Sequence, residues 1–588
     1  MSELALAGLD DRQREAVAAL RGPVCVLAGA GTGKTRVITH RIAHGVDTGA
    51  YSPGRVMAVT FTTKAAGEMR GRLRSLGVEG VAARTFHAAA LAQLNFFWPT
   101  VAKDAAPSLI DNKVRLLAHA AEGMRLDLDT ATLRDVAAEI EWRKVTMRSI
   151  DAYAAARPDG VGRLTVERVV DLQRAYERVK DERRRLDFED VLLACAGMLE
   201  AEPRVARAVR EQYRHFTVDE FQDVSPLQHR LLELWLGDRR DLCVVGDASQ
   251  TVYSFAGADA SFLLDFARRH PDARVIRLET NYRSAPEVLA VANALMRGRP
   301  GALELSAAAG TPGGPVPTVT EYEDDVAEAR GVAHRIADQV RSGVDPGDIA
   351  VLYRAHAQSA ELLRALADLQ LPATVLGGRR FFDVPEVRQA VLALRGASVA
   401  PLDSGFVDAV RDVLRSLGLT EAAPPAGGAL RDAWEARMAL LRLAEEAPTG
   451  TTLRSFTDDL IARAKDHHEP ALRTVTLSTL HAAKGLEWPH VHLVGLAEGQ
   501  LPIGYATTFE SVDEERRLTY VGITRSERTL SASWSRGGSG YRERSPSRFL
   551  REIGSDTLRA ADAPATSAAT SRRVPSQSER NAPPRRTR

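Results

Sequence analysis

A glycine-rich segment near the start of the chain has the residue types of a phosphate-binding loop. Residues 28–35 read AGAGTGKT, directly after the apolar run Val24–Leu27 and before a helical pattern. Glycines let backbone N–H groups curl around phosphate oxygens, and the following helix N-terminus adds partial positive charge. Lys34 would neutralise the β- and γ-phosphates, and the Thr35 hydroxyl would bind Mg²⁺. The usual first glycine of the pattern is replaced here by Ala28.

The whole loop is expected to contact a nucleotide. The alternative is a glycine-rich turn that merely exposes a lysine, and the strand–turn–helix context argues against it. The residues that we expect to bind nucleotide in this segment are Gly29, Ala30, Gly31, Thr32, Gly33, Lys34, Thr35 and Arg36.

A second apolar run ends in the carboxylates that such a site needs. Residues 216–223 read FTVDEFQD. Asp219 can hold the magnesium through water, and Glu220 can polarise the attacking water as a general base. An acidic cluster alone is usually a solvated surface. Its place after a strand, together with Lys34 and Thr35, predicts an enzyme that hydrolyses a nucleoside triphosphate with Mg²⁺.

The elements that must position these residues follow an α/β pattern. Short apolar runs alternate with helical patterns, which is typical of parallel sheets. Strands are expected at 24–27, 56–61, 215–219, 242–246, 275–278, 349–353, 474–477, 491–494 and 529–534. Between about 90 and 184 strand signals vanish and long helical periodicities such as 166–185 take over. The sequence therefore predicts two α/β cores, each interrupted by a helical insertion.

The boundaries follow from these patterns and from composition. Residues 310–315 form a Gly/Pro-rich break, and residues 555–588, with seven Arg and three acidic residues, are typical of a disordered basic tail. We expect the first core at 1–89 and 185–278 with an insertion at 90–184, the second core at 279–384 and 471–553 with an insertion at 385–470, and a tail at 554–588.

Composition describes an ordinary soluble protein. The 588 residues are 44% hydrophobic and 26% charged. The net charge is +1, so the total charge by itself does not indicate a protein that binds nucleic acid. No stretch reaches the roughly 18 apolar residues of a membrane helix. The start of the chain lacks a secretory pattern, so we expect a cytoplasmic, nucleoid-associated protein. The three cysteines lie far apart and form no metal-ligand spacing.

Further segments resemble, in order, the motifs of the superfamily-one DNA helicases of the UvrD/PcrA/Rep family. The resemblance runs from Leu9 to Leu550 and implies two RecA-like cores with ATP between them. It is closest to the second UvrD-like type of actinobacteria, in a form that lacks the C-terminal cysteine cluster and helical module. The segments that carry it are 9–17 (LDDRQREAV), 58–66 (AVTFTTKAA), 85–87 (TFH), 219–223 (DEFQD), 244–255 (VVGDASQTVYSF), 278–284 (LETNYRS), 477–488 (LSTLHAAKGLEW) and 514–525 (EERRLTYVGITR).

The resemblance implies roles for residues outside the phosphate loop. Gln13 would read the adenine edge, Tyr282 would stack on the base and Glu487 would accept from the ribose hydroxyl. An arginine finger matches the charge spread over a transferring phosphoryl group, and Arg525 takes that role. With Lys34 and Glu220, the implied catalytic set is completed by Gln250, Arg283 and Arg525.

The family's DNA contacts also map onto this chain. Stacking of bases on aromatic side chains is sequence-tolerant and suits a motor on single-stranded DNA. A lone phenylalanine or histidine is more often a core residue, so only motif context supports these assignments. The residues implied to contact DNA are Phe61, Thr63, Thr85, Phe86, His87, Tyr253, Phe255 and His481.

Two departures leave the activity open between two interpretations. Ala256 lies where UvrD and PcrA have an arginine, and Thr63 replaces the usual asparagine. The first interpretation is a 3′-to-5′ helicase on single-stranded and tailed duplex DNA, in DNA repair or replication. The second is a translocase that displaces proteins and unwinds only with a partner protein. Either would act as a monomer or weak dimer; a non-catalytic scaffold is disfavoured because the hydrolytic residues are present.

Overall fold

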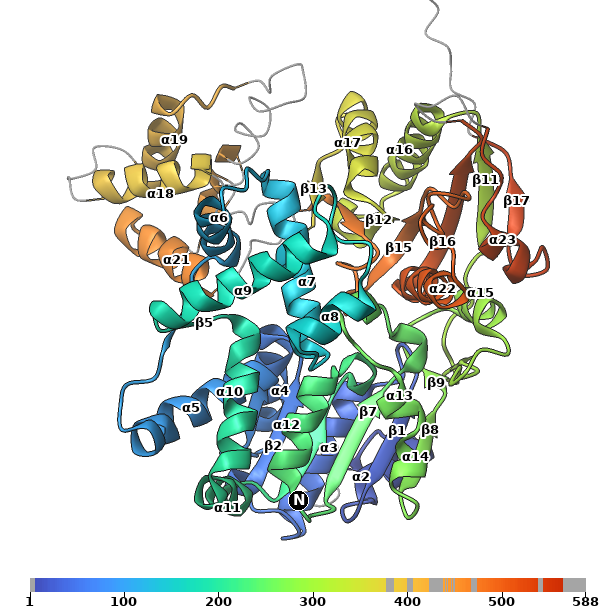
Figure 1. Ribbon diagram of the computed structural model, residues 1–588. Coiled ribbons are helices and arrows are strands. Elements are labelled where there is room, and N and C mark those ends of the chain that lie inside the picture. Colours follow the sequence, from blue (N-terminus) through green and yellow to red (C-terminus); the bar gives the residue numbers. More distant parts are fainter. Residues whose placement is uncertain are drawn as a thin grey trace, which may run out of the picture.

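The computed structural model describes residues 6–376, 385–398, 405–421, 473–537 and 543–563, and also 437–466 apart from 439, 442, 446 and 448–449. Within these ranges two parallel sheets are each covered by helices (Figure 1). We call the two units the first core and the second core. The predicted α/β class with two parallel-sheet cores is confirmed. No helix in the described ranges is long and apolar enough to cross a membrane.

The sheet of the first core has the strand order β3-β2-β6-β7-β1-β8, and neighbouring strands run parallel. Alternate residues face opposite sides, so Val24 and Val26 enter one hydrophobic cluster while Cys25 enters another. Burial on both faces explains the continuous apolar runs. The strands are β1 (Val24–Ala28), β2 (Val56–Thr60), β3 (Ala82–Thr85), β6 (His215–Val218), β7 (Leu242–Gly246) and β8 (Arg274–Leu278).

Helices cover both faces of this sheet. The cluster on one face is formed with α2 (Asp11–Ala18), α3 (Lys34–Asp47) and α4 (Thr63–Ser75). The cluster on the other face is formed with α5 (Phe86–Ala102), α10 (Phe188–Ala201), α11 (Pro203–Gln212), α12 (Pro226–Leu236), α13 (Ser261–Leu264) and α14 (Phe266–Arg269).

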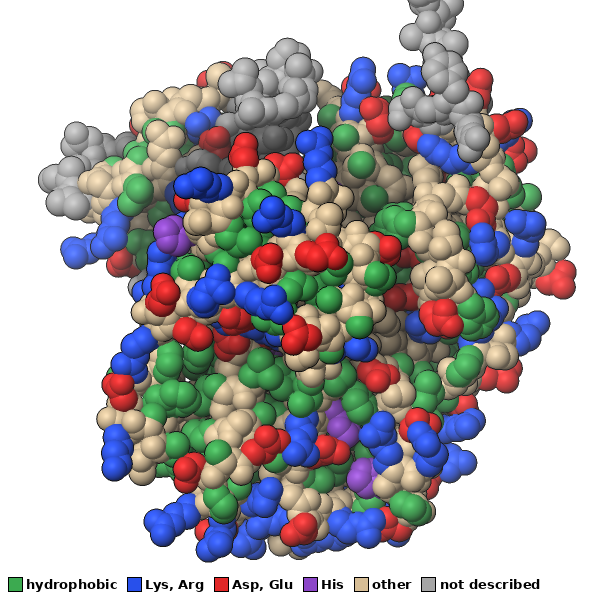
Figure 2. Space-filling model, viewed as in Figure 1, with side chains coloured by type: hydrophobic (Ala, Val, Ile, Leu, Met, Phe, Trp, Pro, Cys, Tyr) green, Lys and Arg blue, Asp and Glu red, His purple; other side chains and the backbone are tan. Residues whose placement is uncertain are grey.

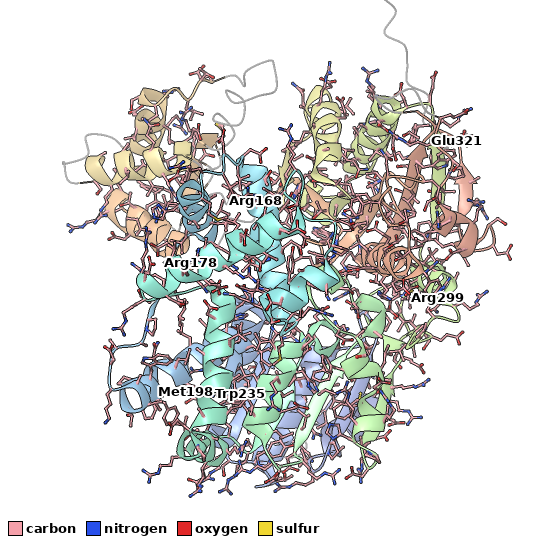
Figure 3. All side chains as sticks on the ribbon, viewed as in Figure 1. Arg168, Arg178, Met198, Trp235, Arg299 and Glu321 are labelled. Carbon is pink, nitrogen blue, oxygen red and sulfur yellow. The ribbon has the colours of Figure 1, made fainter. Side chains whose placement is uncertain are left out.

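The indole of Trp235 holds α5 in the hydrophobic cluster that contains α10 to α14. Trp235 Nε1 donates to Gln93 Oε1 at 2.8 Å, and the Trp235 ring stacks on Phe86 with centroids 5.9 Å apart. Met198 belongs to the same cluster and lies beside Trp235 in Figure 3. α5 is therefore part of the first core, and the insertion begins after it, later than the predicted residue 90.

The insertion has its own hydrophobic cluster and lies above the first sheet in Figure 1. It consists of α6 (Lys113–Gly123), α7 (Thr130–Val145), α8 (Ile150–Ala156) and α9 (Val166–Glu182). Two short parallel strands, β4 (Ser108–Leu109) and β5 (Arg185–Leu186), close its base. The sequence predicted the helices and missed these strands, which are only two residues long.

The sheet of the second core has the strand order β13-β14-β12-β15-β16-β11-β17 and is also parallel. Its strands are β11 (Thr318–Tyr322), β12 (Ile349–Tyr353), β13 (Ala373–Val375), β14 (Val475–Thr479), β15 (Trp488–Leu493), β16 (Ser526–Ser535) and β17 (Arg559–Ala561). Its helices are α15 (Pro286–Met296), α16 (Asp325–Arg341), α17 (Ser359–Asp368), α22 (Phe509–Ile523) and α23 (Arg548–Ile553).

Smaller elements complete the described chain. Short strands β9 (Thr280–Asn281) and β10 (Ser306–Ala307) pair where the chain leaves the first core. Helices in the predicted second insertion include α18 (Pro385–Ala397), α19 (Phe406–Ser416) and α21 (Leu453–Asp466), and the remainder of 385–470 lies partly outside the described residues.

The predicted start of the tail at residue 554 is too early. β17 pairs in parallel with β11 from Thr318 to Thr320, so the sheet of the second core extends to Ala561. The three-residue strand has no apolar run to reveal it in the sequence. The rest of the predicted tail, 564–588, lies outside the described residues.

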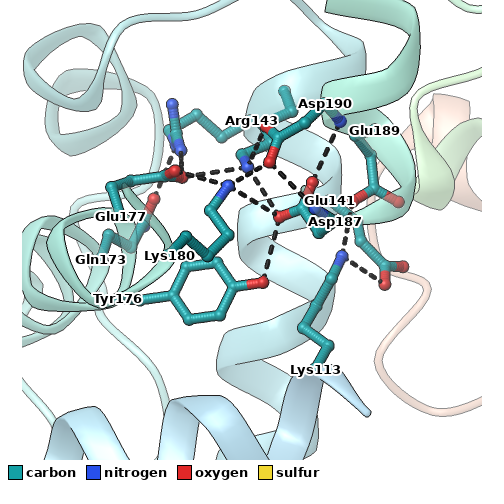
Figure 4. A network of polar contacts seen from close by, with 11 residues as sticks. Lys113, Glu141, Arg143, Gln173, Tyr176, Glu177, Lys180, Asp187, Glu189 and Asp190 are labelled. Atoms are coloured by element: carbon teal, nitrogen blue, oxygen red, sulfur yellow. Dashed lines mark hydrogen bonds and ion pairs between the residues drawn. The ribbon is translucent and has the colours of Figure 1, made fainter. Parts of the chain in front are cut away.

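A buried ionic network ties the insertion to the first core (Figure 4). Lys144 Nζ, on α7, lies 2.6 Å from Asp187 Oδ2 and 2.7 Å from Asp190 Oδ1. Lys180, on α9, lies 3.3 Å from the same Asp187 oxygen and also pairs with Asp190. Asp187 caps the N-terminus of α10 and is fully buried. Both insertion helices are therefore held by one end of a first-core helix.

Asp187→Asn should lower the free energy of unfolding by about 3–5 kcal/mol, because it removes a fully buried carboxylate that two buried lysines share. The measurement is urea denaturation of the full chain followed by circular dichroism. The matched control is Asp151→Asn, which removes an exposed pair with Arg174 and should cost less than about 1 kcal/mol. Equal unfolding curves for Asp187→Asn and wild type would contradict a stabilising network.

Asp187 should also make the stability of the fold depend on pH. Although burial opposes it, Lys144, Lys180 and Lys113 hold the pKa of Asp187 well below its ordinary value. A carboxylate with a lowered pKa stabilises the fold above its unfolded-state pKa, and that contribution is lost as pH falls further. Below about pH 4 the wild type should therefore lose stability more steeply than Asp187→Asn.

Candidate active site

The loop between β1 and α3 is shaped to bind phosphate. Gly31 and Gly33 have φ values of +68° and +84°, which side chains rarely adopt. A Cβ on Gly33 would lie only 3.0 Å from Gln13 Nε2, and one on Gly31 would collide with the amide of Asn281. Within the described residues, no side chain caps the N-terminus of α3. Its first backbone N–H groups are thus available to an anion.

Lys34 lies inside this loop and close to the predicted carboxylates. Its Nζ donates to Ala28 O at 3.0 Å and to Gly29 O at 3.3 Å. Asp219 follows β6, and Glu220 has a left-handed φ of +51°. Left-handed backbone at a non-glycine residue is strained and often marks a functional position. It turns the chain directly after Asp219, so that two adjacent carboxylates lie at the end of one strand.

The surroundings of Asp219 and Glu220 shift the pKa values of the two carboxyl groups in opposite directions. Burial, and then the charge of Glu220, raises the pKa of Asp219 to about 7. Although burial opposes it, Lys34 and Lys484 hold the pKa of Glu220 below its ordinary value. Glu220 is therefore the carboxylate that remains ionised, as a general base requires.

The residues fit a magnesium ion. Asp219 has a raised pKa because its charge is poorly compensated, and a cation beside it would relieve that burial penalty. In the parts of the chain that the structure describes, no three His, Cys, Asp or Glu residues gather as a metal cage. Mg²⁺ often takes one or two protein ligands with water and phosphate oxygens, so Thr35 and Asp219 form a suitable set.

A chain of hydrogen bonds links Glu220 to Gln250. Gln222 Nε2 donates to Glu220 Oε2 at 2.5 Å, and Gln222 Oε1 accepts from the backbone N–H of Asp247 at 3.0 Å. Gln250 Nε2 donates to Asp247 Oδ2 at 2.7 Å. The carbonyl end of Gln250 is therefore turned away from Asp247 and can accept a further bond. The predicted residue Gln250 is placed with the acidic pair.

Two arginines reach this group from the side of the second core. Arg525 Nη2 lies 3.5 Å from Gln250 Oε1, and its other nitrogens donate to carbonyls of Leu486 and Val521. Burial, and then the charge of Arg283, lowers the pKa of the Arg525 guanidinium to about 10. Arg283 pairs with Glu487. The structure thus places Arg525 beside Gln250, with Arg283 close enough to lower the pKa of Arg525.

The predicted base-binding residues flank the phosphate loop. Gln13 is buried, and its Nε2 donates to Thr32 O at 2.9 Å. Tyr282 is 45% exposed, its backbone N–H donates to Gly31 O at 2.9 Å, and its hydroxyl donates to Asp10 at 2.5 Å. An exposed ring held at its hydroxyl end can receive a flat base. Arg36 is close enough to affect the pKa of Tyr282, and Glu487 is exposed beside Arg283.

Four of the predicted DNA-contacting residues in the first core lie at or just before the N-termini of α4 and α5. Phe86 is 1% exposed and stacked on Trp235, so its predicted role in base stacking is wrong. Thr85 is buried and caps α5 by accepting from Ala88 N at 3.1 Å. Phe61 is half-buried against the same cluster, with Phe86 6.1 Å away. Thr63 is exposed at the start of α4.

His87 has an aromatic neighbour that the motif did not reveal. Its ring stacks on Phe188 with centroids 4.1 Å apart, and Phe188 is 55% exposed. Burial lowers the pKa of His87 to about 4, so the imidazole is neutral at physiological pH. His87 and Phe188 together form an accessible flat surface.

The remaining predicted DNA contacts form one aromatic cluster across the two cores. Phe255 is 61% exposed, and its ring centroid lies 5.8 Å from His481 and 6.2 Å from Tyr253. Tyr253 and Phe255 follow β7 in the first core, whereas His481 follows β14 in the second. Burial lowers the pKa of His481 to about 4, which again gives a neutral ring.

Two family models match most of the chain. The UvrD/REP helicase N-terminal domain matches residues 9–271, and the UvrD-like helicase C-terminal domain matches residues 276–399 and 437–537. The chain belongs to the UvrD/REP helicase family. The resemblance that the ordered motifs predicted is confirmed.

Relatives in this family are similar over nearly the whole chain. The ATP-dependent DNA helicase UvrD2 of Mycobacterium tuberculosis is 48% identical over 593 residues, which cover 96% of this chain and 84% of that protein. DNA helicase II of Escherichia coli is 31% identical over 93% of this chain and 88% of its own length. The ATP-dependent DNA helicase Rep of Escherichia coli is 30% identical over 94% of each chain. The identity with UvrD2 confirms the predicted similarity to that type.

Some residues of this UvrD/REP site were missed by the motifs. Lys484, on the second core, forms an ion pair with Asp223 of the first core and donates to Gln250 O at 2.8 Å. Against the effect of burial, Asp223 and Glu220 raise the pKa of Lys484 and keep it charged. Gln222 was also unassigned. Both residues lie inside the motif segments, and this position was the one feature of the sequence that could have assigned them to the site.

Proposed function

We propose that this chain is an ATP-dependent DNA helicase that moves 3′-to-5′ along single-stranded DNA and unwinds duplex DNA. The single observation that carries the proposal is the segment from Gln250 to Phe255. Gln250 lies in the hydrogen-bonded group with Glu220 and Arg525, and Phe255 lies exposed in the aromatic cluster. Six consecutive residues therefore connect a hydrolytic site with a surface for bases.

The chemistry follows from the positions of the side chains. Glu220 accepts the proton of the attacking water, while Lys34 and the phosphate-loop N–H groups hold the β- and γ-phosphates. Thr35 and Asp219 would hold Mg²⁺, which would supply charge neutralisation at the phosphate oxygens. Arg283 and Arg525 contribute positive charge from the other side of the site.

The second core grips the same segment, which supports coupling between hydrolysis and movement. Arg517 Nε donates to Thr251 O at 2.9 Å, and Glu514 Oε1 accepts from Ser254 N at 3.0 Å. Lys484 holds Gln250 O at 2.8 Å. A shift of the second core relative to the first must therefore displace the backbone that carries Tyr253 and Phe255. ATP binding favours the arrangement in which the arginines meet the phosphates, and hydrolysis releases it.

The test pairs ATP turnover, with and without single-stranded DNA, with strand displacement on 3′-tailed and 5′-tailed duplexes. The proposal expects stimulated turnover and displacement of the 3′-tailed duplex only. Displacement of the 5′-tailed duplex alone would contradict the proposed 3′-to-5′ direction. ATP turnover that does not change when DNA is added would contradict the proposal of a motor that moves on DNA.

One observation favours the translocase as a second candidate. Ala256 is exposed beside Phe255, so no guanidinium supports the aromatic cluster at that position. Stimulated turnover without displacement of either duplex would indicate a translocase that needs a partner protein from repair or replication. In both cases we propose a monomer or weak dimer acting on the DNA of the nucleoid in the cytoplasm.

Phe255→Ala should weaken binding of single-stranded DNA about 5- to 150-fold, because one base stack contributes about 1–3 kcal/mol. Basal turnover without DNA should stay unchanged, since Phe255 touches none of the hydrolytic residues. Fluorescence anisotropy with a labelled oligonucleotide measures the affinity. The control Phe96→Ala removes a ring that is 75% exposed on α5 and should leave it unchanged. Equal losses of basal and DNA-stimulated turnover would assign Phe255 a structural role instead.

A further inference from the structure

A basic cavity of about 590 Å³ lies in the first core, away from the active site. Its lining includes five arginines, Arg21, Arg55, Arg214, Arg239 and Arg240. They come from the loops before β1, β2, β6 and β7. The phosphate loop and Asp219 follow the opposite ends of the same strands. Strands of four or five residues rise about 3.3 Å per residue, so the two sites are separated by about 15 Å or more.

Most of the positive charge in this cavity is not compensated. Arg21 pairs with Asp241 at 2.9 Å, and Arg240 pairs with Asp272. Among the described residues, the other three guanidiniums form no ion pair with a carboxylate. Arg55 donates to Glu211 O at 3.3 Å and Arg239 donates to Tyr213 O at 2.9 Å, both backbone carbonyls.

Like charges are crowded here. Partial burial, and then the charges of Arg214, Arg210 and Arg55, lowers the pKa of the Arg239 guanidinium, with Glu211 opposing them. The whole chain carries a net charge of only +1, so this excess is local. In Figure 2, Lys and Arg side chains gather along the lower edge of the molecule, where Figure 1 places α11. Crowded cations that outnumber the nearby carboxylates are stabilised by a bound anion.

The residue types indicate which anion. Guanidinium groups present a planar fork of donors that matches phosphate oxygens. Apart from the arginines, the lining has Ala50, Ser52, Asp241 and the buried His215, which lies 3.3 Å from Asp241 Oδ2. The lining thus offers no exposed ring on which a base could stack. A cavity of this size also exceeds the needs of a single phosphate.

We propose that this cavity is a second phosphate site, separate from the nucleotide loop, for a ligand with two or more phosphate groups. A free condensed phosphate and the backbone of a nucleic acid share this chemistry. The arginines would bind phosphate oxygens directly and would read no base. The site goes beyond the proposed helicase activity and does not depend on it.

The first test titrates tripolyphosphate into the full chain by calorimetry, with a non-hydrolysable ATP analogue and Mg²⁺ saturating the nucleotide site. The variant Arg55→Glu/Arg214→Glu reverses two exposed guanidiniums that have no carboxylate partner. It should bind at least about tenfold more weakly than wild type, because charge-assisted hydrogen bonds are lost. Arg214→Lys retains the charge and should bind detectably, and Arg551→Glu, on α23 of the second core, should equal wild type.

The second test measures binding of a short blunt duplex by filter binding at several salt concentrations. If the backbone of DNA is the source, Arg55→Glu/Arg214→Glu should weaken binding and reduce the slope of log K against log salt by about 1.8, two phosphate contacts at about 0.9 each. The circular dichroism spectrum and the thermal melting temperature report whether the variant is folded. Loss of either ligand in the double variant supports the site and identifies the source. If the double variant equals wild type with both ligands, the proposal is overturned.

Discussion

Glu220→Gln should lower kcat for ATP hydrolysis at saturating single-stranded DNA by about 10²- to 10⁴-fold, the usual contribution of a general base. Glutamine keeps the size and hydrogen-bonding capacity of the side chain but cannot accept the proton of the attacking water. Lys34 and the phosphate loop are unchanged, so binding of ATP and DNA should persist. Steady-state turnover and binding of a fluorescent ATP analogue measure the two effects.

A surface substitution provides the control for this result. Glu233→Gln changes a half-exposed carboxylate on α12 that is not part of the hydrogen-bonded group. Its turnover should equal that of wild type. Turnover of Glu220→Gln at the wild-type rate would show that another group activates the water, and Asp219, with its pKa of about 7, would be the next residue to test.

Arg525→Ala should lower kcat by about 10³- to 10⁵-fold, the effect of removing an arginine finger in phosphoryl transfer. Arg525 is buried and lies 3.5 Å from Gln250 Oε1, so its charge acts where the γ-phosphate is expected. Arg525→Lys keeps a positive charge but loses the planar fork of donors, so its kcat should lie between those of wild type and Arg525→Ala. Single-turnover kinetics with radiolabelled ATP separate this loss from weaker binding.

Because Arg525 also donates to Leu486 O and Val521 O, its removal could disturb α22. The thermal melting temperatures of both variants show whether a loss of turnover comes from a destabilised fold. A variant that melts with wild type yet has lost turnover supports the catalytic role. An alanine variant with wild-type turnover would contradict it.

Strands with long apolar runs were predictable from the sequence. β7 and β12 begin and end at the predicted residues, because both faces of each strand are buried and the run is continuous. β3, with the sequence AART, and β13 were missed because they are short and partly exposed. Pairing in the sheet, which joins residues distant in the chain, decides their structure.

Phe86 shows where motif reasoning fails. The motif implied a DNA contact, but Ala89, Ala90 and Leu94 share a helix face with it at spacings of three, four and eight. That apolar periodicity was the signal for a core residue, and it was available in the sequence. The pair Lys484–Asp223 is different, since its members lie 261 residues apart and only the folded chain brings them together.

The ionic network at the end of α10 has a mechanical consequence. Thermal energy is about 0.6 kcal/mol at room temperature, far less than the cost of separating buried lysines from Asp187. The insertion should therefore follow the first core as a stiff arm. The two cores meet around Gln250 and Ser254 through hydrogen bonds, the Lys484–Asp223 ion pair and a shared apolar cluster that includes Ala30 and Val252. Relative movement of the two cores should therefore rearrange the contacts at this interface, while the insertion moves with the first core as one body.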